Sequence, residues 1–448
     1  MTRKKRLLSR TMMALLLSLT LSACGGQQAT ESSDTVQQSS ETQQSSEEAE
    51  QSESSSASSE QSDAGSQESD TNQSAEATDP AEFVYNVKEF EIPDNEGIRM
   101  VQNMKIGWNL GNSFDAIDCN LADEMKYESA WCGANATPEL FAELKKAGFN
   151  TVRIPVSWHN HLSDKSAYTI SQPWLDRVKE VVGYALDQDM YVIVNIHHDN
   201  SKQFIYPSNE YRDQSVEYVK RIWTQLAEAF RDYDEKVLFA GLNEPRLVGH
   251  NNEWWIDANN QDCKDAIAII NELNQLFVDT VRASGGNNAS RYLICPGYDA
   301  SPDGATNEGF VLPADPVDND HHIILSVHAY TPYNFALESP GVDNWSSKKA
   351  TDVSNMVGFM NKIYNAYIQN GTPVIIDEFG AMEKNGNTYA RTDFAGCFIA
   401  NAKARGISCI WWDNNVTKGN GERFGIIDRK TLEWQFPEIV ENMMKQFE

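Results

Sequence analysis

The 448-residue chain has no long apolar run and comparatively few positive charges. Its longest mostly apolar stretch covers about thirteen residues, 11–23, whereas a transmembrane helix requires roughly twenty. Lys and Arg number 37 against 65 Asp and Glu, which gives a formal net charge of −28. Proteins that bind the phosphate backbone of nucleic acids present a basic face, so this composition argues against nucleic-acid partners. An acidic surface instead suits a neutral substrate.

The sequence also lacks a glycine-rich phosphate-binding turn after its first predicted strand, and its cysteine spacing does not resemble a zinc site. Of the seven cysteines, Cys295 and Cys409 lie in apolar runs and are expected to be small buried side chains. Cys119 and Cys132 lie in one predicted loop and form the one candidate disulfide pair. The spacing leaves open whether that bridge forms.

The N-terminus has the features of an export signal. Five Lys or Arg in the first ten residues precede the short apolar stretch, which predicts a signal peptide over residues 1–23. The segment Leu21-Ser22-Ala23-Cys24-Gly25 resembles a bacterial lipoprotein box, which implies cleavage before Cys24 and lipidation of that cysteine. Because two or more acyl chains anchor a protein stably, we expect an extracellular protein tethered to the bacterial cell membrane.

Residues 24–80 are rich in Ser, Gln and Glu. Between Gln27 and Pro80 there are thirteen Asp or Glu, no Lys or Arg, and almost nothing apolar. Such a segment cannot bury enough apolar surface to offset its chain entropy, so we interpret it as a disordered linker with a reach on the order of 40 Å. The remainder, residues 81–448, is expected to be a single catalytic domain and a monomer.

From about Phe83 onward, short apolar strands alternate with longer amphipathic helices. Strands are expected at Lys105–Leu110, Thr151–Val156, Tyr191–Ile196, Val237–Leu242, Arg291–Pro296, Ile323–Val327, Pro373–Ile376 and Ile407–Trp411. Helices are expected between most of them, and one of these, Pro138–Ala147, begins behind Thr137, a residue type that favours the N-cap. Eight such strands favour a closed (β/α)8 TIM barrel over the alternative, a doubly wound open sheet. The active site of such a barrel lies at the C-terminal ends of its strands.

Polar or aromatic groups stand at the ends of seven predicted strands. In chain order they are Asn109, Arg153, His197-His198-Asp199, Asn243-Glu244, His328-Ala329-Tyr330, Asp377-Glu378 and Trp412-Asp413. Burying so many unpaired polar groups would cost stability, so we interpret them as a functional rim.

Glycoside hydrolysis by two carboxylates is the chemistry that suits this rim. Glu244 and Glu378 follow the fourth and seventh strands, which lie across the barrel mouth from one another. From there the two groups can approach to the roughly 5–5.5 Å that a retaining mechanism requires. The other strand ends offer mainly Asn, Glu, Tyr and Trp, so we expect no catalytic metal and no cofactor; a metal cluster built on the His-His-Asp run is the alternative.

The remaining rim residues suit supporting roles. Asn243 is placed to bind the sugar 2-hydroxyl, and Arg153 and Tyr330 to keep Glu378 ionised and oriented. Three histidines can orient the carboxylates or bind sugar hydroxyls: His197, His198 and His328. Trp412 offers a stacking face under the reacting sugar, and Trp411 is expected to face the helices. Four further tryptophans suit either outer sugar subsites or packing: Trp131, Trp158, Trp254 and Trp255.

Asn243-Glu244-Pro245 and Ile376-Asp377-Glu378-Phe379-Gly380 resemble the two catalytic signatures of glycoside hydrolase family 5, the cellulase barrels. The segments MKIGWNLGNSFDA, TVRIPVSW, NIHHD, HAY and WWD match that family in order and position, and the resemblance covers about residues 97–446. It implies that Glu244 is the acid/base and Glu378 the nucleophile. It also implies that the subsite around the cleavage point contains Arg153, His197 or His198, Asn243, His328, Tyr330 and Trp412. From its strand end, Asn109 is added to the expected substrate-binding residues, together with both histidines. The Cys119–Cys132 insert departs from common members and puts the distant glycone subsites in doubt.

The sequence as a whole resembles the branch of that family from anaerobic gut and rumen bacteria. This resemblance implies an endo-β-1,4-glucanase. Its expected substrate is a plant cell-wall β-glucan such as cellulose, mixed-linkage glucan or xyloglucan. Three alternative functions remain. They are a β-mannanase or transglycosylating enzyme of the same family, a non-catalytic glycan-binding lipoprotein, and a metal-dependent barrel hydrolase. Both carboxylates are present, which favours a hydrolase over a binding protein.

Overall fold

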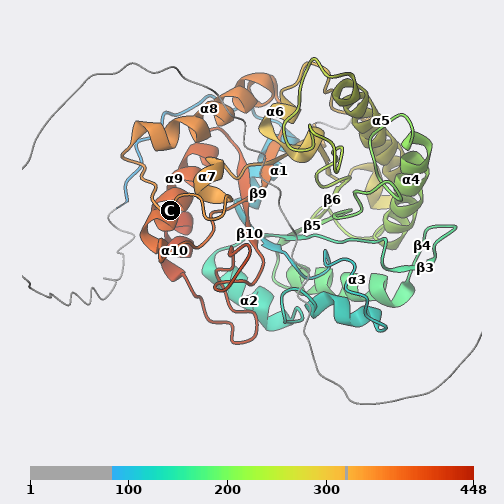
Figure 1. Ribbon diagram of the computed structural model, residues 1–448, viewed down its shortest axis with the longest axis horizontal. Helices are drawn as coiled ribbons and strands as arrows, with labels where there is room; N and C mark the ends of the chain where they lie inside the picture. Colours follow the sequence, from blue (N-terminus) through green and yellow to red (C-terminus); the bar gives the residue numbers. More distant parts are fainter. Residues whose placement is uncertain (1–82, 318–320) are drawn as a thin grey trace, which may run out of the picture. The chain divides into compact units, whose positions relative to one another are not determined.

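A computed structural model describes residues 83–317 and 321–448 of the chain (Figure 1). The predicted signal peptide, Cys24 and the whole predicted linker lie outside these residues. Within the described part, eight parallel strands close into a barrel in the order β1-β10-β9-β8-β7-β6-β5-β2. Their bounds are β1 Ile106–Leu110, β2 Thr151–Ile154, β5 Tyr191–Asn195, β6 Val237–Ala240, β7 Leu293–Pro296, β8 Ile323–His328, β9 Val374–Phe379 and β10 Ser408–Asp413. The predicted (β/α)8 barrel is confirmed.

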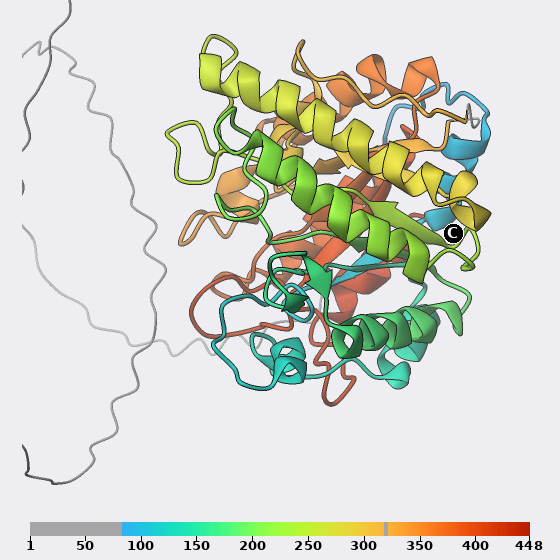
Figure 2. The same ribbon diagram turned by 90° about the vertical axis from the view of Figure 1, so that its right-hand side faces the viewer.

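A helix follows each barrel strand, and Figure 1 shows these helices around the strands. They are α2 Pro138–Ala147, α3 Gln172–Leu186, α4 Arg212–Ala229, α5 Gln261–Ala283, α6 Pro302–Ala305, α8 Ala350–Ala366, α9 Thr388–Lys403 and α10 Pro437–Lys445. The two long helices α4 and α5 lie side by side on one flank (Figure 2). Smaller elements are α1 Glu96–Met104, α7 Tyr333–Ala336, the hairpin β3 Leu162–Asp164 with β4 Thr169–Ile170, and the 3₁₀ turns η2 Glu124–Ser129, η3 Gly286–Ala289, η4 Tyr298–Ala300 and η5 Ile368–Asn370.

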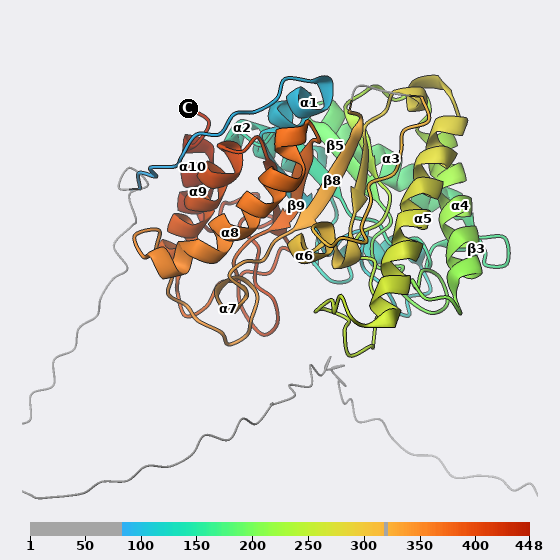
Figure 3. The same cartoon turned by 90° about the horizontal axis from the view of Figure 1, so that it is seen from above.

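The barrel interior is apolar at its N-terminal end. Inward side chains from six strands form one layer, and α1 packs against it with Met100, Val101 and Met104. The layer consists of Ile193, Leu238, Ile294, Ile324, Ile375 and Ile410. Because α1 covers this end, the polar side chains gather at the opposite end, where the strands finish. Figure 3 shows α1 on the side of the barrel opposite α7, which follows β8.

Several predicted boundaries change for identifiable reasons. β2 ends at Ile154 because the Val156 amide donates to the Asn195 side chain, 3.0 Å away, instead of continuing the ladder. Thr137 precedes α2 as expected, but its side chain makes no capping hydrogen bond, so the predicted cap is wrong in that respect. Gly148 ends α2 with φ of 107°, a left-handed conformation that glycine adopts without a steric penalty.

The candidate disulfide does not form. Cys119 and Cys132 are both free thiols. The buried Cys132 thiol forms hydrogen bonds instead: it donates to the Ala134 carbonyl at 3.1 Å and lies 3.5 Å from Ser113 Oγ. Among the helices of the described residues, none combines the length and apolarity that crossing a bilayer requires.

Candidate active site

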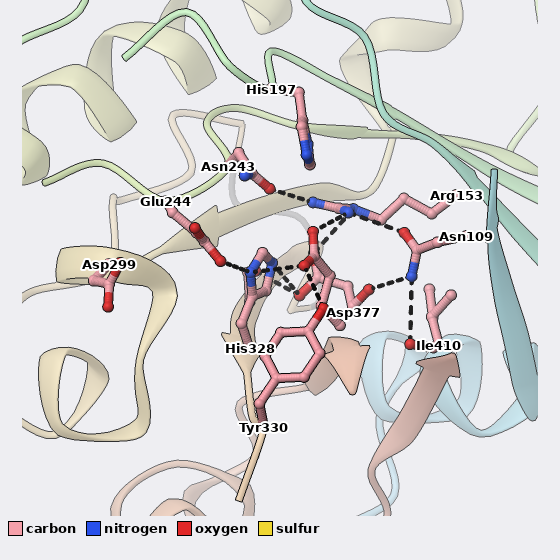
Figure 4. Close-up of polar contacts among 12 residues, drawn as sticks. Asn109, Arg153, His197, Asn243, Glu244, Asp299, His328, Tyr330, Asp377 and Ile410 are labelled. Carbon is pink, nitrogen blue, oxygen red and sulfur yellow. Dashed lines mark hydrogen bonds and ion pairs between the residues drawn. The ribbon is translucent and has the colours of Figure 1, made fainter. Parts of the chain in front are cut away.

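Glu244 and Glu378 both contact His328 at the barrel mouth, as predicted from their strand ends, and Figure 4 shows Glu244 beside that histidine. Glu244 follows β6, and Glu378 lies on β9. His328, the last residue of β8, lies between them, with Nδ1 2.8 Å from Glu244 Oε1 and 3.6 Å from Glu378 Oε2. One carboxylate oxygen from each glutamate and one nitrogen of His328 lie within 4.8 Å of one another. The two carboxylates are therefore close enough to act on one bond.

An irregularity in β9 turns two consecutive acidic residues into the barrel. Val327 of β8 pairs with Ile376, but the next residue, His328, pairs with Glu378, so Asp377 is an extra residue in the register. Consecutive side chains of a regular strand point to opposite faces, and a bulge re-aims them. Asp377 therefore accepts a 2.6 Å hydrogen bond from Ser326 Oγ, while Glu378 accepts hydrogen bonds from Arg153 and Tyr330.

Each oxygen of Glu378 has its own donor. Arg153 Nη1 donates to Oε1 at 2.7 Å, and Tyr330 Oη donates to Oε2 at 2.9 Å. Arg153 Nη2 also donates to Asn243 Oδ1 at 2.6 Å. These contacts agree with the predicted roles of Arg153 and Tyr330 in holding Glu378. Because Arg153 is fully buried, it acts through Glu378 and Asn243 and is not available for direct contact with a substrate.

Asn109 does not have the predicted substrate-binding position. It is fully buried; its Nδ2 donates to the Asp377 carbonyl at 2.9 Å, and its Oδ1 accepts from Arg153 Nη1 at 2.9 Å. The protein itself uses both ends of the amide. Asn109 therefore orients Arg153 through this hydrogen bond, and the expectation that Asn109 would bind sugar is wrong.

The charges around His328 are strongly coupled. Burial opposes protonation of its imidazole, but Glu378 and Asp377 outweigh burial and raise the pKa of His328 to about 10. Burial alone would raise the pKa of Glu244, yet the hydrogen bond and charge of His328 lower it to about 2. Burial raises the pKa of Glu378, with Glu244 adding to the rise and His328 and Arg153 opposing it. The imidazolium of His328 is thus shared by both carboxylates.

Two histidines line the other side of the mouth. His197 and Trp412 have parallel rings with centroids 5.8 Å apart, and the His198 ring lies 6.0 Å from that of Trp131. Burial lowers the pKa of both histidines, that of His198 to about 4, so both are neutral near pH 7. A neutral imidazole can exchange hydrogen bonds with sugar hydroxyls.

The same two histidines form, with Asp115, a group whose ligand atoms lie within 4.8 Å of one another. Neutral imidazole nitrogens and a carboxylate can ligate a transition metal. Asp115 is fully buried, and burial raises the pKa of its carboxyl to about 7. Of the described residues, this set and the Glu244–His328–Glu378 trio are the two groups with a geometry suited to a metal ion.

The tryptophans separate into rim and core. Trp412 faces the mouth, because it lies two residues beyond the inward Ile410, while Trp411 packs outward against Phe379, as predicted. Trp131, Trp254 and Trp255 are 41%, 52% and 70% exposed and remain available to a polymer. Trp158 is fully buried and donates to the Asn195 carbonyl, so it is a packing residue.

Comparison with known proteins identifies the family. The family model described as "Cellulase (glycosyl hydrolase family 5)" matches residues 114–418. The chain belongs to glycosyl hydrolase family 5. Among relatives, it is 41% identical over 344 residues to Endoglucanase 1 of Ruminococcus albus, covering 76% of this chain and 79% of that one. It also matches the cellulase/esterase CelE of Acetivibrio thermocellus at 38% identity, covering 79% of this chain but only 40% of that longer protein.

Solved structures agree with this assignment. A family 5 lichenase from Caldicellulosiruptor sp. F32 is 50% identical, with a TM-score of 0.80 over 82% of this chain and 99% of that one. A broad specificity endoglucanase from Ruminococcus champanellensis, solved with cellotriose, is 42% identical, with a TM-score of 0.72 over 79% of this chain and all of the other. The protein is therefore a glycoside hydrolase.

The sequence-based prediction did not assign three residues that the structure places in this family 5 site. Asp377 was noted only as the neighbour of Glu378, because the bulge that turns it inward leaves no mark in the sequence. Arg246 directly follows Asn243-Glu244-Pro245, and its Nη1 lies 3.3 Å from Glu244 Oε2. Asp299 lies three residues beyond the fifth strand, the one strand end where no polar group was assigned. A search of a few residues past each strand would have found both.

Proposed function

We propose that this family 5 member is a retaining endo-β-1,4-glucanase, with Glu244 as the acid/base and Glu378 as the nucleophile. The observation that carries the proposal is the approach of the two carboxylates to within 4.8 Å around His328. Retaining glycosidases have carboxyl groups about 5–5.5 Å apart, whereas inverting enzymes need roughly 6.5–9.5 Å to admit a water molecule. The observed proximity favours the retaining mechanism.

The donors around each carboxylate support the assignment of roles. Glu378 receives hydrogen bonds from Arg153 and Tyr330, which stabilise its ionised form and orient it for attack. In the first step Glu378 attacks the anomeric carbon, the bond to the leaving oxygen breaks, and Glu244 donates a proton to that oxygen. In the second step Glu244 takes a proton from water, the water oxygen attacks the anomeric carbon, and Glu378 leaves as a carboxylate.

The proton for the first step is available on His328. In the resting site the surrounding carboxylates keep this proton on His328. Its Nδ1 is hydrogen-bonded to Glu244 at 2.8 Å, and a transfer along this bond during cleavage would convert Glu244 into the acid form and His328 into neutral imidazole. The transfer removes the negative charge of Glu244, which raises the pKa of Glu378, and also the positive charge of His328, which lowers it. Arg153 is then the cation that holds Glu378 in its ionised form.

Other mouth residues suit a neutral sugar chain. Asn243 gives its amide oxygen to Arg153, so its amide nitrogen is the group that can donate to the sugar 2-hydroxyl. Trp412 and the neutral His197 and His198 offer a stacking face and hydrogen-bonding groups beside the carboxylates. The related proteins are described as a lichenase, a broad specificity endoglucanase and a xyloglucan-specific endo-β-1,4-glucanase, which supports plant β-glucans as substrates.

Azide rescue tests the two roles separately. In the Glu378→Ala variant, azide can replace the missing nucleophile and attack an activated aryl cellobioside, giving the α-glycosyl azide. In the Glu244→Ala variant, the covalent intermediate still forms from a substrate with a good leaving group, and azide then opens it to the β-glycosyl azide. The product configuration is read by NMR. Exchanged configurations would reverse the assignment, and no rescue of either variant would contradict the mechanism.

A panel of polymers tests the substrate class. The panel contains carboxymethyl-cellulose, barley β-glucan, xyloglucan, xylan and glucomannan, with wild type and Glu378→Ala compared on each. A rapid fall in viscosity on one or more glucans, absent in the variant, is expected. Activity confined to glucomannan would indicate a mannanase, and binding without turnover would indicate a glycan-binding protein. Loss of activity with a chelator would favour a metal-dependent hydrolase.

We also propose that the chain is exported, lipidated at Cys24 and attached to the bacterial cell membrane by its 24–80 linker. The support is the order of basic residues, apolar stretch and Leu21-Ser22-Ala23-Cys24 in the sequence. Expression in a bacterium with a radiolabelled fatty acid should label the wild type but not the Cys24→Ala variant. Equal labelling, or none in either protein, would contradict the anchor.

A further inference from the structure

Arg246 lies among three carboxylates beside the proposed acid/base. Its Nη1 is 3.3 Å from Glu244 Oε2, while its Nε is 3.2 Å from Glu253 Oε1 and 3.8 Å from Asp299 Oδ1. The guanidinium also lies 4.0 Å from the centre of the Trp254 ring. One cation therefore serves three acidic groups, two of which are fixed to it by shorter contacts.

Asp299 is held against the acid/base loop by its backbone. Its amide donates to the carbonyl of Pro245, the residue after Glu244, at 2.9 Å. Asp299 and Ala300 both have left-handed backbone conformations, with φ of 57° and 47°. Non-glycine residues persist in that region when their surroundings hold them there, and they cluster at functional sites. The fold thus places a second carboxyl group close to Arg246 and behind Glu244.

The carboxyl group of Asp299 has fewer hydrogen-bond donors than those of Glu253 and Glu244. Glu253 has a further donor, the Gly249 amide at 2.7 Å, and Glu244 has His328. Asp299 Oδ1 is buried and has no hydrogen-bond partner among the described residues. With three carboxyls around one guanidinium, full ionisation would leave negative charge that Arg246 alone cannot balance, so the ionisation of Asp299 and that of Glu244 oppose one another.

We propose that Asp299 is a positioning residue for the general acid: it competes with Glu244 for Arg246 and so keeps a proton on Glu244 during cleavage. When Arg246 pairs with Asp299 and Glu253, Glu244 loses a stabilising cation and gains a nearby negative charge. Both changes favour its protonated form. The inference rests on the proposed function of Glu244 and adds a residue from the fifth strand end to the machinery.

Several charged groups face this pair. Those facing Glu244 are Asp299, Arg246, His198, His328, Tyr330, Glu378 and Glu422. Those facing Asp299 are Glu244, Arg246, His328 and Glu253. Burial and then the charge of Glu244 raise the pKa of Asp299 to about 8, while His328 lowers that of Glu244 to about 2, so in the resting site the proton lies on Asp299, and Asp299 competes for Arg246 once it ionises.

The Asp299→Asn variant tests the inference by a pH profile. A neutral amide cannot compete for Arg246, so Arg246 pairs more fully with Glu244, which then loses its proton at lower pH. For an aryl cellobioside with a poor leaving group, the alkaline limb of kcat/KM is expected to move down by about one pH unit. For the dinitrophenyl cellobioside, whose leaving group needs no protonation, kcat/KM should stay close to wild type.

A matched control is Asp303→Asn in the same segment, whose side chain is 74% exposed and forms an ion pair with Lys362 at 3.4 Å. Its profile should coincide with that of the wild type. An alkaline limb that stays in place or moves upward in Asp299→Asn would overturn the inference. Glu244→Gln is measured in parallel: if it slows both substrates equally, Glu244 is not the acid, and the proposed function fails independently of Asp299.

Arg246→Gln provides a second test if Asp299→Asn does not fold, as judged by its thermal unfolding. Removing the shared cation destabilises the ionised form of Glu244, so the alkaline limb is expected to move upward, opposite in sign to the first variant. A downward shift or an unchanged limb would contradict the competition for Arg246.

Discussion

Asp377 lies beneath His328, with its Oδ1 3.6 Å from the imidazole Nε2. Its other oxygen lies 3.6 Å from Nε of Arg153, so one buried carboxylate supports both cations that contact Glu378. Removing one partner of a buried ion pair leaves an uncompensated charge and typically costs about 3–5 kcal/mol. Asp377 can adopt this position only because β9 carries the bulge that also turns Glu378 inward.

Asp377→Asn is therefore expected to lower the free energy of unfolding by about 3 kcal/mol and to reduce kcat strongly. The variant keeps the size of the side chain but removes the charge that balances His328 and Arg153. Chemical denaturation measures the first effect. Asp343→Asn, at an exposed site bonded to Asn385, is the control and should behave as wild type. An Asp377→Asn protein as stable and active as wild type would show that the cations do not depend on this carboxylate.

Tyr330→Phe removes one of the two donors to Glu378 and leaves Arg153 in place. A hydrogen bond to a charged group contributes about 1.5–3 kcal/mol, so kcat/KM is expected to fall roughly 10- to 100-fold. Steady-state kinetics on a soluble glucan measure the change. Tyr333→Phe, three residues away and half exposed, should have little effect. Equal effects of the two substitutions would mean that the Tyr330 hydroxyl does not assist the nucleophile.

The sequence predicted the barrel and the two carboxylates because both depend on local patterns. Each of the eight strands is a short apolar run between helices, and the alternation of side chains along a strand predicts that Trp411 and Trp412 face opposite sides of the barrel wall. Glu244 and Glu378 stand at the ends of strands four and seven, where barrel geometry alone brings them to one mouth. These features require no knowledge of particular long-range contacts.

The parts that sequence reasoning missed depend on such contacts. Asn109 at a strand end is compatible with sugar binding or with support of a neighbour, and only its hydrogen bond to Arg153 from the adjacent strand decides between them. The register shift at Asp377 depends on pairing with both β8 and β10, and Arg246 meets Asp299 only because β6 and β7 are neighbours. No periodicity in the chain records these pairings.

Cys119 and Cys132 should both be detected as free thiols. A reductant is expected to leave the melting temperature of the catalytic domain unchanged, because there is no bridge between them to reduce. A thiol reagent should modify the partly exposed Cys119 faster than Cys132, whose thiol is buried among hydrogen-bonding groups. Mass spectrometry of the native protein measures both rates. A drop in melting temperature with reductant would indicate that the bridge forms.

His328 should make the stability of the domain depend on pH above neutrality. Its pKa is raised from 6.5 to about 10 in the folded protein, chiefly by Glu378 and Asp377 against the effect of burial. The folded state thus binds the proton more tightly than the unfolded state. The associated stabilisation is fully present below pH 6.5, declines above it, and is lost as the pH rises through about 10. Linkage sets this contribution at no more than about 5 kcal/mol.

His328→Asn, which keeps a donor near the position of Nδ1, should lose this pH dependence. Denaturation between pH 6 and 10 should show a falling free energy of unfolding for the wild type and a flatter profile for the variant. His198→Asn is the matched control. Burial lowers the pKa of His198 to about 4, so its contribution is present above pH 6.5 and is lost only as the pH falls through about 4. If His328→Asn and wild type change in parallel from pH 6.5 to 10, His328 is not held as an imidazolium by the surrounding carboxylates.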